Sequence, residues 1–325
     1  MVMMNKSILM VLVITVLSVS CSNDDDDKVS DDSGKLISPE MENMALSSAA
    51  TFTGALMVYP CMPDTSFYYG NYNTQDELVP FNAYYTVGNG SIVSSLIPVR
   101  LPVGDYNFLY WGVMKNSQAD STYDAVAIDE PGLRKGANLA DLYYSLHKEN
   151  YSDTTYFPVY DYVHAVQTLH VGTDKMEATL SRAVAGLKVT IVNHDGSTMD
   201  SCISSSRILI SDIAGQLNCY TAEPSDFSKT VAFPLTVSAD SLSMSANSTV
   251  MLFPSGSTPE LTIIIYLKNG QNKKFAKALA NPLIAGNRLT LDVSLGDLYV
   301  EEGSSDGFEV KEWNEKTEVI NLFDD

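Results

Sequence analysis

The sequence predicts an all-β fold of two β-sandwich domains that follow an N-terminal signal and an acidic tether. Apolar and polar residues alternate with a period of two wherever the sequence is regular, which indicates half-buried strands. Turn-forming residues separate most of these runs, as in Gly-Asn-Gly at 88–90 and Lys-Asn-Gly at 268–270. Short strands at this spacing favour sandwiches over a parallel αβ sheet. Removal of the signal leaves about 305 residues, enough for two ordinary domains.

The first twenty residues have the layout of a secretory signal peptide. Lys6 precedes an apolar run at 8–17, and small residues lead to Cys21. The run is shorter than the roughly 20 residues needed to span a bilayer, and an acidic tract follows it. Cleavage between 20 and 21 would leave Cys21 as a lipidated N-terminus. An ordinary secretory signal is the alternative, because Ser18 stands where lipoprotein signals usually have leucine.

Residues 21–36 are predicted to be an extended tether that holds the body off the membrane, because a run of like charges cannot fold. The tract resembles the export signal that sends lipoproteins of Bacteroides-type bacteria to the outer face of the outer membrane. This resemblance implies a surface-exposed, lipid-anchored protein. The export signal would consist of Ser22, Asn23, Asp24, Asp25, Asp26 and Asp27.

Composition limits the partners of the mature protein. Forty acidic residues against twenty basic ones argue against binding to nucleic acid or to anionic lipid. The cysteines other than Cys21 are three in number, which excludes a full disulfide framework. Cys202 and Cys219 could still pair as neighbours across a hairpin, and the sequence leaves this open.

The strands are predicted from alternation and turn positions. In residues 288–295 the odd positions are apolar, as in a half-buried antiparallel strand, and 187–192 repeats the pattern. Residues 261–267 contain the isoleucine run of a more central strand. Further strands are expected at 50–59, 83–87, 92–98, 106–111, 163–171, 207–213, 231–235, 249–253, 308–313 and 317–323.

One segment has helical spacing, and one marks a domain junction. Apolar residues within 139–146 recur at helical intervals behind Asn138 as a cap, with Asp141 in the first turn. A break at 172–175 predicts domains at 37–174 and 175–325. The alternation changes phase at 185–186, which requires a bulge or a pivot there.

The sequence contains no motif for catalysis, and we expect neither an enzyme nor a cofactor. His164 and His170 share one strand face, but without a third ligand nearby they predict no metal site. Arg182 lies on the apolar side of its strand, so a buried-edge ion pair or a snorkelling stem is expected. The many tyrosines of the N-terminal half suit sandwich packing first and a sugar- or protein-binding surface second.

Several short motifs together resemble the fimbrillin-associated anchor proteins of the Bacteroidia-type (type V) pilus. They are the lipoprotein start, the Leu-Pro-Val-Gly-Asp-Tyr-Asn-Phe run at 101–108 with Trp-Gly at 111–112, Asp-Leu-Tyr-Tyr at 141–144, the segment 180–192 and Val-Lys-Glu-Trp at 310–313. The resemblance implies two tandem transthyretin-like, Greek-key β-sandwiches that join other pilins by strand donation. It implies the lipid-held anchor of a pilus or a minor subunit.

The resemblance also separates anchors from shaft subunits. Shaft and tip pilins of the superfamily lose an N-terminal segment to an arginine-directed or trypsin-like protease, which opens a groove. This chain has no arginine between Cys21 and Arg100, and its only lysines there are Lys28 and Lys35. An uncleaved first strand at 50–59 fits a permanently anchored subunit. The rival hypotheses are a surface glycan-binding lipoprotein of a polysaccharide-uptake system and a stand-alone adhesin for host protein.

A subunit with a filled groove must join the pilus by donating a strand of its own. The C-terminal strands follow an acidic, glycine- and serine-rich lead at 301–307. Equally, these strands could complete the C-terminal sandwich of the same molecule. The candidate donor residues are Phe308, Val310, Trp313, Val319, Ile320 and Leu322.

Overall fold

The computed structural model describes residues 34–48, 50–115, 125–150, 154–246 and 248–295, together with the backbone of 308–311. Residues Ser33–Asp325 form one compact unit. Within the described residues the protein is built of strands, and its one helical element is a single 3-10 turn. The prediction of an all-β fold is therefore confirmed.

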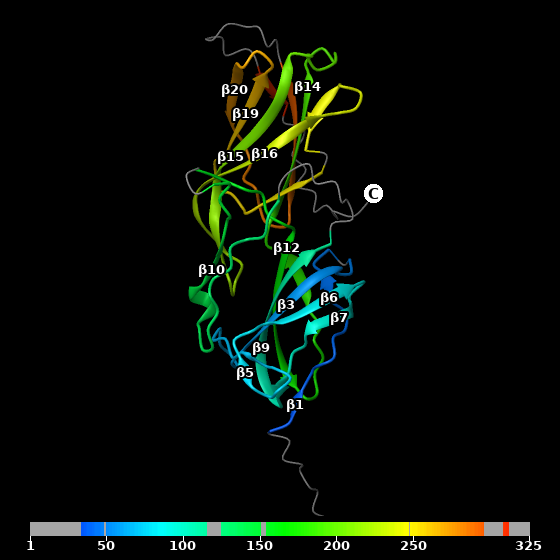
Figure 1. Ribbon diagram of the computed structural model, residues 1–325, viewed down its shortest axis with the longest axis vertical. Helices are drawn as coiled ribbons and strands as arrows, with labels where there is room; N and C mark the ends of the chain where they lie inside the picture. Colours follow the sequence, from blue (N-terminus) through cyan, green and yellow to red (C-terminus); the bar gives the residue numbers. More distant parts are fainter. Residues whose placement is uncertain are drawn as a thin grey trace, which may run out of the picture. The chain divides into compact units, whose positions relative to one another are not determined.

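The first sheet is formed mainly by the N-terminal half of the chain (Figure 1). Its pairs are antiparallel except the short pair between its first two strands. The central strands carry the prominent apolar and aromatic runs, because both of their faces are covered. In spatial order the strands are β2 (Ala45–Leu46), β13 (Thr179–Arg182), β12 (Tyr162–Val171), β9 (Gly104–Met114), β3 (Gly54–Cys61), β6 (Ala83–Gly88) and β7 (Ser91–Ile97).

The second sheet contains the C-terminal half of the chain and two short strands from its middle. Its spatial order is β20 (Asn272–Ala278), β19 (Glu260–Leu267), β15 (Ile203–Asn218), β16 (Pro224–Val237), β17 (Ser243–Ser245), β14 (Ala185–Asn193), β21 (Arg288–Leu295) and β22 (Phe308–Lys311). Beside this path, β10 (Tyr143–Ser145) pairs with β15, β11 (Thr155–Tyr156) with β16, and β18 (Val250–Leu252) with β14.

Two short strand pairs complete the described strands. β1 (Leu36–Ile37) pairs with β8 (Leu101–Pro102), and β4 (Asn71–Tyr72) pairs with β5 (Leu78–Val79). Both pairs are antiparallel. β4 and β5 lie within the connection from β3 to β6, whereas β1 and β8 are far apart in the chain.

The direction of β21 differs from the prediction. Its alternation is as expected, since Leu291 and Val293 are buried while Thr290 and Asp292 are exposed. However, β21 pairs with β14 in parallel and only with β22 in antiparallel. Alternation reports which face is buried, whereas strand direction depends on the connecting path, so the expectation of an antiparallel strand was wrong for the β14 side.

The prediction of a helix at 139–146 was also wrong. The 3-10 turn covers only Leu139–Asp141, and the Asn138 side chain accepts a hydrogen bond from the Ala140 N–H at 3.3 Å, as a cap does. The chain then continues as β10, where Tyr143 is exposed and Tyr144 is buried. The capping residue was therefore predicted correctly, but the chain forms a β-strand after a single helical turn.

The chain passes from the first sheet to the second between Arg182 and Ala185. Ala183 and Val184 are both buried at this passage. This passage is the pivot that the phase change required, two residues earlier than expected. The division into domains at 174/175 remains a prediction.

The buried apolar residues form two clusters, and both sheets contribute to one of them. One cluster lies within the first sheet and includes Leu56, Val58 and Phe108. The other cluster combines residues of the second sheet with Leu109 and Trp111 of β9. The body is thus packed continuously from one sheet into the other.

Candidate functional site

The C-terminal edge of the second sheet carries the candidate donor segment. β22 lies at the end of the sheet and pairs antiparallel with β21 of the same chain. In this register Phe308 lies opposite Leu295 and Val310 lies opposite Val293. The structure therefore places these two predicted donor residues on the edge of their own molecule.

The remaining predicted site residues lie outside the described residues. These are Cys21 with the export-signal residues Ser22, Asn23, Asp24, Asp25, Asp26 and Asp27, and the donor candidates Trp313, Val319, Ile320 and Leu322. Their proposed roles stay predictions.

The strand that receives β22 is firmly held on its other side. β21 pairs with β14 along its whole length, from Arg288 to Leu295. Leu291, Val293 and Leu295 are at most 3% exposed. The receiving strand therefore belongs to the core, whereas β22 has only one described neighbour.

The first long strand of the body, β3, is an integral part of the first sheet. It pairs with β9 on one side and with β6 on the other. Leu56 and Val58 are fully buried. Removal of this strand would open the centre of the sheet and leave two large apolar faces exposed to water.

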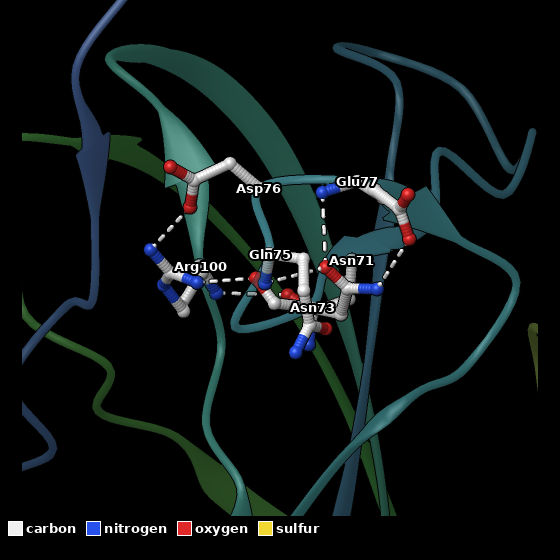
Figure 2. Close-up of polar contacts among 6 residues, drawn as sticks. All are labelled: Asn71, Asn73, Gln75, Asp76, Glu77 and Arg100. Atoms are coloured by element: carbon white, nitrogen blue, oxygen red, sulfur yellow. Dashed lines mark hydrogen bonds and ion pairs between the residues drawn. The ribbon is translucent and has the colours of Figure 1, made fainter.

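Arg100 is the first arginine after Cys21, and a network of hydrogen bonds holds it (Figure 2). Its guanidinium contacts Asp76 at 2.6 Å and the Asn73 carbonyl oxygen. Its backbone N–H donates to Asn71 Oδ1 at 2.8 Å, and its carbonyl accepts from the Tyr72 N–H at 3.1 Å. Both backbone groups and the side chain of Arg100 are thus engaged.

The loop that contacts Arg100 is itself closed by Asn73. Asn73 Oδ1 accepts hydrogen bonds from the backbone N–H groups of Gln75 and Glu77, both at 2.9 Å (Figure 2). Such Asx geometry fixes a turn locally. A protease needs an extended, accessible substrate strand, so this arrangement protects the peptide bond after Arg100. Asn71 and Asn73 lie 29 and 27 positions before Arg100, so no local pattern in the sequence indicates these contacts.

A hairpin tip of the second sheet is joined to the first sheet by polar contacts. Trp111 Nε1 donates to the Cys219 carbonyl oxygen at 2.7 Å, and His164 Nε2 lies 2.9 Å from the Tyr220 carbonyl oxygen. Asn107 Nδ2 donates to the Tyr220 hydroxyl at 3.3 Å. We call Trp111, His164, Cys219 and Tyr220 the joint. Sequence patterns cannot identify it, because its two halves lie far apart in the chain.

A buried ion pair lies where the chain crosses between the sheets. Asp161 precedes β12 and Arg182 ends β13, and Arg182 Nε is 3.1 Å from Asp161 Oδ1. Their side chains are 9% and 8% exposed. Burial raises the pKa of the Asp161 carboxyl, and the Arg182 guanidinium counteracts this shift. The expectation of a buried ion pair for Arg182 is confirmed, and Asp161 is the partner that the sequence did not name.

The histidines are explained by packing and hydrogen bonds. His164 packs edge-on against Trp111, with ring centroids 5.0 Å apart. His170 Nδ1 lies 2.7 Å from Asp105 Oδ1 at the exposed end of β12. Among the described residues no group of histidine, cysteine or acidic side chains is arranged to hold a metal ion.

Acidification is expected to destabilise the joint through His164. Burial lowers the pKa of this imidazole to about 4, below its usual value near 6.5. Because the pKa is lower in the folded state than in the unfolded state, the neutral imidazole stabilises the fold fully above pH 6.5. This contribution to the free energy of unfolding, at most about 3 kcal/mol, is lost as the pH falls towards 4. Unfolding in denaturant at pH 7 and pH 4.5 should show this loss, and His164→Gln should reduce it. An unchanged pH dependence in His164→Gln would contradict the assignment.

The buried thiols are unreactive by environment. Cys61 and Cys219 are free, and burial raises the pKa of each thiol to about 12. Because Cys219 is free, it forms no disulfide with Cys202. Several tyrosines of the N-terminal half pack in the core, namely Tyr68, Tyr85, Tyr144 and Tyr162, whereas Tyr143 and Tyr160 are exposed.

Within the described residues, no helix has the length and apolar character needed to cross a membrane.

Comparison with known proteins identifies the family. The sequence profile of the fimbrillin-A associated anchor proteins Mfa1 and Mfa2 matches residues 47–319. No curated protein sequence matches the chain.

The solved structures that match the chain include two fimbrial proteins from Porphyromonas gingivalis. The fimbrial anchor protein Mfa2 has a TM-score of 0.44 and 12% identity, over 79% of this chain and 87% of its own. The tip fimbrial protein Mfa3 with a C-terminal truncation has a TM-score of 0.42 and 11% identity, over 85% of this chain and 98% of its own. A candidate cell adhesion protein from Bacteroides uniformis has a TM-score of 0.45 and 15% identity, over 85% of this chain and 96% of its own.

The family profile spans most of the chain, from residue 47, directly after β2, to residue 319, beyond β22. The chain therefore belongs to the family of fimbrillin-A associated anchor proteins Mfa1 and Mfa2, and its role is that of a fimbrial anchor or a minor fimbrial subunit.

Proposed function

We propose that this protein is the lipid-held anchor of a fimbrium, attached to the outer membrane through Cys21 and joined to its pilin partners by β-strand addition. The family supports a place in the fimbrium at the cell surface. The acidic tract after Cys21 supports export to the outer face of the outer membrane. The proposal includes no catalytic residue and no cofactor, because the role of an anchor is mechanical.

The central position of β3 is the observation that carries the anchor assignment. A subunit that kept its lipid must keep its N-terminal segment, and β3 lies between β9 and β6 in the middle of the first sheet. The protected position of Arg100 supports the same conclusion, because cleavage there would detach β3 from the rest of the sheet. Cleavage after Lys35 would remove the tether alone, since β1 begins at Leu36.

Strand donation is proposed for the C-terminal segment. β22 pairs with a single described strand along only four residues, so its release costs few backbone hydrogen bonds. The receiving β21 would keep its ladder with β14 after this release. An extended segment freed in this way can add to the open sheet edge of a pilin. The alternative is that β22 stays in place and completes its own sandwich.

Truncation after Val300 tests the donor role. Under donation the truncated protein should stay folded and lipidated, because β21 is still held by β14, while fimbriae are shed into the medium. The measurement is the ratio of cell-bound to released fimbriae, with the melting temperature as a check on the fold. A folded, lipidated truncation that retains its fimbriae excludes donation by this segment. A truncation that is degraded in cells favours the alternative.

A further inference from the structure

The strand β7 leaves one edge of the first sheet open. It lies at the end of the sheet and pairs only with β6 among the described strands (Figure 1). Every residue of β7 except the last, Ile97, is exposed. The side chains of Val93 and Leu96 are 70% and 79% exposed. Such an edge presents unpaired backbone N–H and C=O groups beside apolar side chains.

Two bulges give β7 its unusual surface. The register between β6 and β7 shifts twice, and the two residues that it skips are Val93 and Leu96. A bulge bends the strand and re-aims the side chain of the extra residue. In β7 both re-aimed side chains are apolar and project into solvent. Bulges that protect an edge would be expected to present charge instead.

A second edge of the same chain shows what protection looks like. β20 ends the other sheet and carries Lys273, Lys274 and Lys277 within seven residues. Lysines on an edge strand discourage pairing with another chain. β7 has the same length but contains neither a charged residue nor a proline. The chain therefore blocks one exposed edge and leaves the other available.

We propose that the outer edge of β7 receives an extended strand from a neighbouring fimbrial subunit. Backbone hydrogen bonds along β7 would hold the added strand, and its apolar side chains would cover Val93 and Leu96. This inference rests on the proposed fimbrial role and adds a receiving site to an anchor whose β3 stays in place.

The negative charge of the chain indicates which kind of strand can bind to β7. With forty acidic and twenty basic residues, two copies of this chain repel each other. An uncharged or basic strand from a different subunit meets no such repulsion, and β7 itself contributes no charge. An uncharged or basic strand from a different subunit therefore suits this edge better than a second copy of this chain.

Photocrosslinking from β7 on intact cells tests the contact. A Cys202→Ser background removes the partly exposed thiol, and Ser94→Cys then carries a maleimide-linked diazirine on β7. Ala276→Cys on β20 is the matched control, because it is an exposed residue of the lysine-protected edge. We expect an adduct that contains a fimbrial subunit from Ser94→Cys and not from Ala276→Cys. Equal labelling from both positions, or an adduct of two copies of this chain, overturns the proposal.

Substitution of the exposed apolar residues provides the second measurement. Val93→Lys with Leu96→Lys should abolish the Ser94→Cys adduct and should increase the share of released fimbriae. Val166→Lys is the control, because Val166 is 41% exposed on β12 of the same sheet. The melting temperatures should match wild type, since all three side chains face solvent. An adduct that survives the β7 lysines overturns the receiving site, while release of fimbriae by Cys21→Ala would still support the anchor.

Discussion

Cys21→Ala is expected to convert the protein from fully membrane-bound to soluble. Each buried methylene of an acyl chain contributes about 0.8 kcal/mol, so several chains at one cysteine make attachment effectively irreversible. Without the thiol no lipid can be added. The measurement is the distribution of the protein between the membrane pellet after a carbonate wash and the supernatant. Fimbriae should appear in the medium in the same cells.

Cys202→Ala is the matched control, because it removes a cysteine of the folded body. It should leave the protein in the pellet and the fimbriae on the cells. If Cys21→Ala still sediments with membranes after the carbonate wash, the lipid anchor is wrong and another means of attachment must exist. If the variant is released but the fimbriae stay, the protein is a surface lipoprotein that does not hold the shaft.

Arg182→Ala is expected to destabilise the body by about 3 to 5 kcal/mol, because it leaves the buried Asp161 carboxylate without its partner. Asp161 is 9% exposed and accepts from Arg182 Nε through both carboxylate oxygens, at 3.1 and 3.2 Å. Urea denaturation at pH 7 measures the loss. The loss should shrink at low pH, because the carboxyl is then protonated and no longer needs the cation.

Two further variants serve as controls for the effect of Arg182→Ala. Lys175→Ala breaks an exposed pair with Glu42, where Lys175 is 44% exposed, and should change stability by less than about 1 kcal/mol. Arg182→Met combined with Asp161→Leu removes both charges and should recover much of the lost stability. If Arg182→Ala costs no more than Lys175→Ala, the buried pair does not stabilise the crossing.

Alternation predicted most of the sheets, because burial of one face imposes a period of two on any strand. The expected strands at 163–171, 187–192, 261–267 and 288–295 all lie within observed strands. The strand β20 was missed for a physical reason, since its lysines protect an edge and leave too few apolar residues for an alternating pattern. Short strands such as β4 and β5 are defined by their partners and carry no pattern of their own.

The contacts between distant segments could not be predicted from one sequence. Trp111 and Cys219 are separated by 108 positions, and nothing in either local sequence indicates the other. Arg182 was recognised as anomalous because a charged residue stood in an apolar position, but its partner Asp161 lies in a segment without regular alternation. The relative direction of β14 and β21 could not be predicted either. The alternation of apolar and polar residues is the same in parallel and in antiparallel strands.

The crossing between the sheets has a mechanical consequence. Among the described strands the chain changes sheet three times, from β9 to β10, from β11 to β12 and from β13 to β14, and the pair Asp161–Arg182 links the last two passages. A pull that separates the two sheets is therefore shared by three covalent connections, two of which are tied together by the ion pair. A single linker would stretch under such a load. Several connections in parallel transmit it, and a subunit that holds a filament against flow gains a stiff connection between its two sheets.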